Sequence, residues 1–355
     1  MYDFKVKSNI HDYTVSFITD TLETIDRELG EGDYILVDRN ILELYGPDLE
    51  TTLSKQKFII IDANETQKSY AGIIPIIEKL ILNGFRKNHR LIAIGGGITQ
   101  DITSFISSVL YRGVDWIYFP TTLLAQCDSC IGSKTSINFG EFKNQIGGFY
   151  PPLKIFINTA FLTTLPPEQI MSGLGEMCHY FPIAGEADFK RYAREYQLAI
   201  QDPTVMEGLI SRSLEIKKGY IEIDEYDRKE RQIFNYGHSF GHALESLTNY
   251  RIPHGIAVSY GLDMANYVSV KMGLLQESIR IDMRAVLETI WKGTSISDVS
   301  IDRFLTALSK DKKNVGTELR LILSEGYGKI VKKSVKLDQN FSDIIQQYFR
   351  EELSK

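Results

Sequence analysis

Cysteine is scarce in this chain of 355 residues, which contains only three. Cys127, Cys130 and Cys178 make an odd number, and no export signal accompanies them. We therefore expect no disulfides and a reducing, cytoplasmic environment. Cys127 and Cys130 have the C-x-x-C spacing of redox and metal motifs, but no second pair completes a structural zinc site, so we interpret all three as packing residues.

Other absences narrow the class of protein further. No uninterrupted apolar run is long enough to span a membrane. The first fourteen residues mix charge and polarity without an apolar core, so we expect neither a signal peptide nor a transit peptide. The net charge of -6 argues against a general nucleic-acid surface, although a local basic pocket could still bind an anionic ligand. These features predict a soluble globular protein without a membrane or nucleic-acid partner.

The hydrophobic pattern changes along the chain. Short β-branched runs at 34–37, 58–61, 91–94, 116–119 and 155–157 alternate with helical patterns such as 73–82. This alternation predicts a mainly parallel α/β sheet covered on both faces. From about Pro166 onward the helical periodicities lengthen, at 168–180, 205–223, 256–272 and 279–290. We predict a Rossmann-like α/β domain over 1–166 and a mostly α-helical domain over 167–355.

Three of the six histidines lie in one short segment, at His238, His242 and His254. His238 and His242 stand at i and i+4, which places two side chains on one helix face. Imidazole is a common zinc ligand, and His254 could close the same site. The alternative is that these are ordinary histidines near helix ends. On spacing alone, we favour a metal site.

A glycine run, Gly95 to Gly97, follows the predicted strand 91–94 and precedes a helical stretch from Thr99. Backbone N–H groups of such a turn can approach phosphate oxygens closely. A tight strand-to-helix turn explains the run equally well. Polar residues follow other predicted strands, where ligands bind in open α/β sheets. Together they suggest a dinucleotide site formed by Asp38, Asn40, Glu65, Lys68, Thr121 and Thr122.

Lysines stand among glycines and small residues in the segment 128–147, at Lys134 and Lys143. This setting favours anion ligands over a solvated helix face. The alternative is a flexible basic loop.

The order of these motifs resembles the sugar phosphate cyclases, and most closely the 3-dehydroquinate synthase family. The resemblance extends from about Asp38 to Gly328. It rests on the segments 94–97 with Asp101, 111–113, 120–126, 133–135, 143–144, 173–176, 235–242, 254–255 and 311–313.

The resemblance implies a divalent metal, zinc or cobalt, held by Glu176, His238 and His254. By the same resemblance, His242 contacts the substrate and is not a metal ligand. It also implies a tightly used NAD that is not consumed. The implied NAD contacts are Asp38, Asn40, Glu65, Lys68, Gly96, Gly97, Asp101, Thr121, Thr122 and Lys143.

The implied activity is that of a carbon–oxygen lyase. It converts 3-deoxy-D-arabino-heptulosonate 7-phosphate to 3-dehydroquinate and phosphate, through transient oxidation by NAD, β-elimination of phosphate, reduction and an intramolecular aldol cyclisation. The residues matching catalytic positions are Lys134, Asn235, His242 and Asp128. Those matching other substrate contacts are Asn144, His179, Lys217, Arg231, Lys312 and Arg112, the last supplied by the neighbouring subunit of a homodimer.

The chain departs from the family pattern at four positions. His179 stands where the family has a lysine, one helical turn after the metal-binding glutamate. Ser133 stands where the family has a glycine, and Asp227 and Ile256 each stand where it has a glutamate. His179 lies in the implied substrate pocket, which leaves open a divergent cyclase acting on another sugar phosphate.

Two other classes of function stay open. An iron-type NAD-dependent polyol dehydrogenase would share the fold, but Lys134, Lys217 and Arg231 supply more cations than an uncharged alcohol needs. A non-catalytic binding protein with the same fold is the other alternative.

Overall fold

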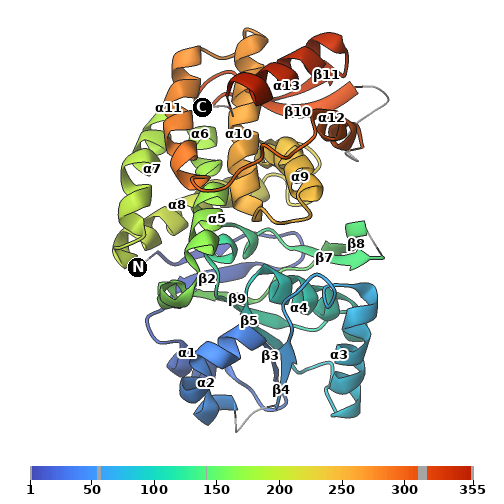
Figure 1. Cartoon of the computed structure of the whole chain (residues 1–355). Coiled ribbons are helices and arrows are strands. Elements are labelled where there is room, and N and C mark those ends of the chain that lie inside the picture. The colour runs from blue at the N-terminus through green and yellow to red at the C-terminus, as the bar shows by residue number, and fades with distance from the viewer. Residues whose placement is uncertain (1, 54–56, 141, 311–317, 353–355) are drawn as a thin grey trace. The chain divides into compact units, whose positions relative to one another are not determined.

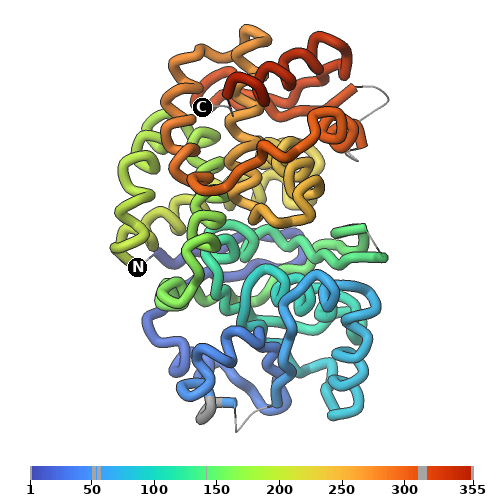
Figure 2. Tube along the Cα trace, in the orientation of Figure 1, coloured from blue at the N-terminus to red at the C-terminus, as the bar shows by residue number. Residues whose placement is uncertain are grey.

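The computed structural model describes residues 2–53, 57–140, 142–310 and 318–352. The chain divides into two compact units. The first unit comprises residues 1–165 and 210–227, and the second comprises 166–209 and 228–355. The first unit is therefore built from two stretches of chain, and the second of them, 210–227, includes most of helix α8 (Pro203–Ile221). Figure 2 traces the course of the chain from the N-terminus to the C-terminus. The roles of the two parts in binding NAD and metal stay predictions.

A seven-stranded sheet forms the centre of the first unit, in the order β1-β2-β9-β6-β5-β3-β4. Its strands are β1 (Phe4–Val6), β2 (Tyr13–Phe17), β3 (Tyr34–Asp38), β4 (Lys57–Ile61), β5 (Leu91–Gly95), β6 (Trp116–Pro120) and β9 (Lys154–Ile157). The β1–β2 pair is antiparallel and every other neighbouring pair is parallel. All five strands predicted from the sequence are present, and the predicted mainly parallel α/β fold is confirmed.

Helices cover both faces of this sheet, which explains why β3, β5 and β6 are buried along their whole length. Figure 1 shows α1 (Thr21–Glu28) and α2 (Arg39–Leu53) on one side and α4 (Gly97–Val109) on the other. Ile25 and Leu49 of the first two helices belong to the same buried hydrophobic cluster as the strand residues Val37 and Ile94. Helix α3 (Tyr70–Leu82) contains the helix predicted at 73–82.

The rest of the first unit includes short helical turns and an antiparallel hairpin. The turns are η1 (Leu110–Arg112), the π-helical η2 (Ala125–Ser129) and η3 (Thr159–Thr164). The hairpin pairs β7 (Lys134–Phe139) with β8 (Phe142–Phe149). It occupies much of the segment for which a flexible basic loop was the alternative, and that alternative is wrong for the paired residues.

The second unit is mostly helical, as predicted. Its helices are α5 (Pro167–Cys178), α6 (Tyr180–Ala184), α7 (Glu186–Ala199), η4 (Glu230–Asn235), α9 (His238–Leu247), α10 (His254–Lys271), α11 (Glu277–Ile290), α12 (Ile301–Ser309) and α13 (Gln339–Glu351). An antiparallel hairpin that the sequence pattern did not predict joins β10 (Glu318–Ser324) to β11 (Ile330–Lys336). Helix α10 is buried from Gly255 to Ser269 and forms the core of this unit. Among the described residues, no helix combines the length and apolarity needed to cross a membrane.

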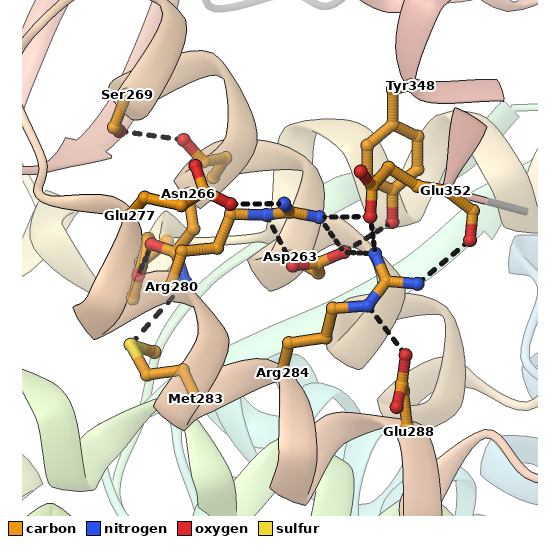
Figure 3. Close-up of polar contacts among 12 residues, drawn as sticks. Asp263, Asn266, Ser269, Glu277, Arg280, Met283, Arg284, Glu288, Tyr348 and Glu352 are labelled. Carbon is orange, nitrogen blue, oxygen red and sulfur yellow. Dashed lines mark hydrogen bonds and ion pairs between the residues drawn. The ribbon is translucent and has the colours of Figure 1, made fainter. Parts of the chain in front are cut away.

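A buried ionic network fixes the C-terminal helix α13 against α10 and α11 (Figure 3). Asp263 of α10, which is fully buried, accepts hydrogen bonds from Arg280, Arg284 and Tyr348. Both arginines also donate to Glu352, which follows α13. Every charged group in the centre of the network is thus paired.

This network does more to fix the position of α13 than to add net stability. Burial raises the pKa of Asp263 even though Arg280 and Arg284 act to lower it. The desolvation of the ionised carboxylate therefore outweighs the stabilisation that it receives from the two arginines. Buried ion pairs commonly have this balance, and yet removing one partner is costly because the other charge stays buried.

We expect Asp263→Asn to lower the free energy of unfolding by about 3–5 kcal/mol, because two buried guanidinium groups lose their shared carboxylate. The measurement is urea unfolding followed by circular dichroism. The matched control is Asp298→Asn, whose side chain is 65% exposed and pairs with Arg251, and which should cost less than about 1 kcal/mol. Equal effects of the two substitutions would contradict this account of the network.

The three cysteines are buried and reduced, as the sequence predicted for packing residues. Burial raises the pKa of Cys130 to about 12, with Asp128 adding to the shift and Lys217 opposing it. Burial also raises the pKa of Cys178. A thiol with a raised pKa is protonated near neutral pH, so neither cysteine is suited to redox chemistry.

We expect the native protein to react slowly with a thiol reagent such as DTNB at pH 8, and to show three reactive thiols once unfolded in urea. Burial and the raised pKa of Cys130 both disfavour the thiolate. Rapid reaction of Cys127 and Cys130 in the folded protein, or their oxidation to a disulfide, would restore the redox interpretation.

Candidate active site

Three helices of the second unit bring Glu176, His238 and His254 together. Glu176 lies near the end of α5, and the two histidines are the first residues of α9 and α10. The distance from His238 Nε2 to Glu176 Oε1 is 3.4 Å, and that from His254 Nε2 to Glu176 Oε2 is 3.3 Å. One ligand atom from each residue lies within 4.8 Å of the other two. The spacing suits three ligands of one metal ion.

Glycines next to the ligands allow this close approach. A Cβ atom at Gly255 would lie 1.7 Å from the carbonyl oxygen of Ser172, and one at Gly175 would lie 2.2 Å from the carbonyl oxygen of Gly255. The backbones of α5 and α10 are therefore in direct contact beside Glu176 and His254. Any larger residue at either position would force these helices apart and separate the carboxylate from the imidazole.

The partners of the two histidines fix their tautomers. His238 Nδ1 is 3.2 Å from the backbone oxygen of Tyr236, and His254 Nδ1 is 3.1 Å from Glu245 Oε2. A carbonyl or carboxylate oxygen accepts hydrogen bonds, so each Nδ1 carries the proton when the ring is neutral. Each Nε2 then presents a lone pair toward Glu176. This is the arrangement that histidine ligands of metals usually show.

The charge state of the site follows from its burial and contacts. Burial acts to raise the pKa of Glu176, but His238, His254 and His179 outweigh it and hold the pKa well below its usual range. Burial acts to lower the pKa of His254, but Glu245 and Glu176 outweigh it and raise the pKa well above its usual value. Glu176 is thus ionised, and His254 holds a proton where no metal competes for it.

These residues fit a divalent metal ion. Glu176 Oε2 is buried and has no well-aligned hydrogen-bond donor among the described residues. A buried carboxylate whose two oxygens each face an imidazole nitrogen is costly to leave without a cation. Two histidines and one carboxylate are also a ligand set of catalytic zinc, which leaves a coordination position open for substrate.

The remaining predicted residues of the second unit differ in their exposure. His179 is fully buried, with Nδ1 2.5 Å from the backbone oxygen of Glu176. His242 is exposed, and its ring centre lies 5.4 Å from that of His238. Arg231 is buried, and Asn235 is half-buried and donates to the backbone oxygen of Gln232. Lys312 lies outside the described residues.

In the first unit, the glycine run forms the turn between β5 and α4. Gly96 is the N-cap of α4 and Gly97 its first residue, with no side chain capping the helix. A Cβ atom at Gly96 would lie 2.9 Å from Thr122 Cγ2, so the turn packs closely against the residues after β6. Thr121 N donates to the backbone oxygen of Gly95. The N–H groups at the start of α4 are available to an anion such as a phosphate.

Polar residues gather beside this turn in pairs. Asn40 donates to Asp38 Oδ1 from both its backbone and its side chain, while burial raises the pKa of Asp38. Lys68, itself buried, pairs with Asp101 at 2.5 Å. Burial raises the pKa of Asp101, and Lys68 opposes this shift.

Two side chains of the β7–β8 hairpin, Lys143 and Asn138, contact Glu65. Lys143 Nζ lies 2.9 Å from Glu65 Oε1, and Asn138 donates to Glu65 Oε2. Asn138 also accepts a hydrogen bond from the backbone of Asn144. Burial acts to raise the pKa of Glu65, but Asn138 and Lys143 outweigh it and lower the pKa. The predicted cofactor residues Glu65 and Lys143 are therefore in contact.

Two other predicted lysines of the first unit also pair with carboxylates. Lys134 Nζ lies 2.5 Å from Asp227 Oδ2, and Lys217 Nζ lies 2.6 Å from Asp128 Oδ1. The departures from the family pattern at Asp227 and Ser133 thus lie at or beside a predicted catalytic lysine. Arg112 is exposed.

The backbone conformation at Ser133 explains why the family pattern has a glycine at this position. Ser133 has a φ of 65°, a backbone conformation that glycine adopts most easily. Its hydroxyl donates to Glu225 Oε1 at 2.9 Å. This hydrogen bond offsets part of the strain of the positive φ.

Sequence reasoning missed Glu245 and Asn138. Glu245 contacts His254, and Asn138 links Glu65 to Asn144. One signal for Glu245 was available, because it lies seven residues after His238, on the same face of a helix. Asn138 had no such signal, because its partner Glu65 is far away in the sequence.

Comparisons with known proteins identify the family of this chain. The family of the 3-dehydroquinate synthase N-terminal region matches residues 58–172, and that of the 3-dehydroquinate synthase C-terminal region matches 173–314. The 3-dehydroquinate synthase of Alkaliphilus metalliredigens (strain QYMF) is 33% identical over 316 residues, which is 87% of this chain and 88% of that protein.

Solved structures share the fold. A 2-deoxy-scyllo-inosose synthase complexed with carbaglucose-6-phosphate, NAD+ and Co2+ gives a TM-score of 0.88 at 22% identity, over 97% of this chain and 99% of that one. The 2-epi-5-epi-valiolone synthase of Streptomyces hygroscopicus subsp. jinggangensis 5008, with NAD+ and Zn2+ bound, gives a TM-score of 0.86 at 23% identity. The match covers 96% of this chain and 97% of that one. Since the two family regions together cover most of the chain and the curated relative matches over most of its own length, this chain belongs to the 3-dehydroquinate synthase family.

Proposed function

We propose that this protein is a 3-dehydroquinate synthase, a carbon–oxygen lyase that converts 3-deoxy-D-arabino-heptulosonate 7-phosphate to 3-dehydroquinate and phosphate with no net use of NAD. The observation that carries the proposal is the cluster of Glu176, His238 and His254, in which both Nε2 atoms face one ionised carboxylate. Membership of the family supports the choice of reaction.

A divalent metal ion, zinc or cobalt, would be held by these three residues. When bound, it would polarise substrate oxygens, and NAD would accept a hydride and later return it. The protein's own part is to keep both imidazoles in the Nδ1–H tautomer and to keep Glu176 ionised. Both conditions follow from the contacts of His238 and His254 described above.

The first unit would bind NAD. The turn Gly95 to Gly97 at the start of α4 would offer backbone N–H groups to the pyrophosphate, and close packing against Thr99 and Thr122 leaves no room for a side chain at Gly95 and Gly96. The polar residues beside it would complete the contacts. The proposed set is Asp38, Asn40, Glu65, Lys68, Gly96, Gly97, Asp101, Thr121, Thr122 and Lys143.

The remaining predicted residues would bind the substrate. Lys134, Asn235, His242 and Asp128 would act at the reacting atoms, and Asn144, Lys217, Arg231 and Lys312 would bind phosphate, hydroxyl and carboxylate groups. Arg112, which is exposed, would come from the second subunit of a homodimer. The three reduced, buried cysteines support a cytoplasmic location.

His179 differs from the other proposed substrate residues because it is fully buried and bonded to the backbone of Glu176. In this position it contributes less charge to a substrate than the lysine that the family pattern has there. This difference is the specific observation that favours the second candidate, a cyclase of the same family with another sugar phosphate as substrate.

With NAD and either zinc or cobalt, the protein should release phosphate from the heptulosonate phosphate without a lasting rise in NADH absorbance. Glu176→Gln should lower the rate by about 100-fold or more, since the carboxylate is lost as a metal ligand. Glu186→Gln, an exposed carboxylate of the same unit, is the matched control and should keep the full rate. Absence of phosphate release under these conditions would refute the proposal.

The same assay separates the alternatives. Phosphate release from a heptulose or hexose phosphate, but not from the heptulosonate phosphate, would identify a divergent cyclase. Steady accumulation of NADH with a polyol would identify a dehydrogenase. If the unchanged protein showed neither phosphate release nor NADH accumulation with any of these compounds, and Glu176→Gln behaved in the same way, a binding protein would be indicated.

Metal affinity should rise with pH between about 6 and 8, by up to about tenfold per pH unit, because His254 must lose a proton to bind metal. Calorimetric titration with zinc in buffers of different protonation enthalpy measures the proton released. An affinity that does not change over this range would contradict the prediction.

The raised pKa of His254 also determines how the stability of the metal-free protein depends on pH. The protonated ring stabilises the fold fully below the pKa of the unfolded state, and this contribution is lost as pH rises through the pKa of the folded state.

A further inference from the structure

Glu245 makes a contact that the proposed metal site does not yet explain. It lies on α9, and its Oε2 atom is 3.1 Å from His254 Nδ1 on α10. Its side chain is only 13% exposed. A carboxylate that is largely removed from water and aimed at the far nitrogen of a metal-facing imidazole is more than a surface ion pair.

The two histidines of the site are held in different ways. The Nδ1 atom of His238 faces a neutral backbone oxygen, that of Tyr236, whereas the Nδ1 atom of His254 faces the carboxylate of Glu245. A carboxylate acceptor fixes the tautomer and also makes the imidazole a stronger electron donor. His254 needs this support more, because its side chain is 32% exposed against 12% for His238.

From this geometry we propose that Glu245 is a positioning residue of the metal site. It holds the His254 ring with Nε2 toward Glu176 and strengthens Nε2 as a ligand, without binding the metal itself. The proposal rests on the metal site of the proposed function and adds a residue to it.

The packing of α9 against α10 does not depend on Glu245. A Cβ atom at Gly261 of α10 would lie 2.0 Å from the backbone oxygen of Gly237, which precedes α9, so the backbones are in direct contact there. The buried residues Phe240 and Leu244 add apolar packing on α9. Changing Glu245 should therefore alter the orientation of the His254 ring and leave the helices in place.

A competing interpretation uses the same residues as a second metal site. His242, Glu245 and His254 also present ligand atoms within 4.8 Å of one another. In that arrangement Glu245 would be a ligand, and His254 would bind this metal through Nδ1. The number of metal ions per chain distinguishes the two interpretations.

The test compares Glu245→Ala and Glu245→Gln with the unchanged protein. The metal-free proteins are titrated with zinc against a chromophoric chelator and with Co2+ while the visible d–d absorption is recorded. We expect one metal ion per chain in all three. Affinity should fall about 10–100-fold in Glu245→Ala, and less in Glu245→Gln, whose amide oxygen still accepts from Nδ1. The d–d bands should shift in both variants.

Glu186→Ala is the matched control, because it removes an exposed carboxylate from the same unit and should leave affinity and spectrum unchanged. Urea unfolding of the metal-free variants checks that the fold is intact. Two metal ions per chain in the unchanged protein and one in Glu245→Ala would overturn the proposal in favour of a second site. Unchanged affinity and spectrum in both Glu245 variants would overturn it while leaving the proposed function intact.

A failure of the proposed function gives a different result. If the unchanged protein bound no metal, or bound it equally well as Glu176→Gln, the metal site itself would be refuted, and with it the role of Glu245.

Discussion

The buried carboxylate of Glu176 is the constraint on which the second unit depends. A buried ionised carboxylate is stable only with positive charge or hydrogen-bond donors around it. Here the groups that face it are imidazoles, which can be neutral metal ligands or cations. The raised pKa of His254 indicates that a proton on this ring can supply the charge that Glu176 requires, and a metal ion in the proposed site would supply it instead.

Close helix packing makes this site possible, and glycine makes the packing possible. Gly175 and Gly255 stand directly beside Glu176 and His254, and each gives room for a backbone oxygen of the neighbouring helix. The buried Asp263 then fixes the middle of α10 to the C-terminal helix. The orientation of His254, the first residue of α10, thus rests on contacts along the whole length of that helix.

Much of the fold could be predicted from the sequence, because the signals are local. The apolar runs of β3, β5 and β6 indicate strands buried on both faces, and the long helical periodicities indicate α8, α10 and α11. The β7–β8 and β10–β11 hairpins were missed. Strand β8 has two glycines and no buried residue, and β11 contains three lysines, so neither shows a clear apolar alternation. In the site, the resemblance to a family supplied Glu176, which no spacing rule connects to His238. Glu245 was missed because its partner His254 lies on the next helix.

The lysines of the first unit are the groups with which we propose that this acidic chain binds anionic ligands. Lys68, Lys134, Lys143 and Lys217 each pair with a carboxylate of the same unit. Three of these lysines, Lys68, Lys143 and Lys217, are at least partly buried, where a cation without a partner would be costly. A phosphate or carboxylate ligand must then compete with Asp or Glu for each ammonium group. A doubly charged phosphate would compete better than an uncharged polyol, so the pairs that hold these lysines are consistent with the proposed anionic substrate.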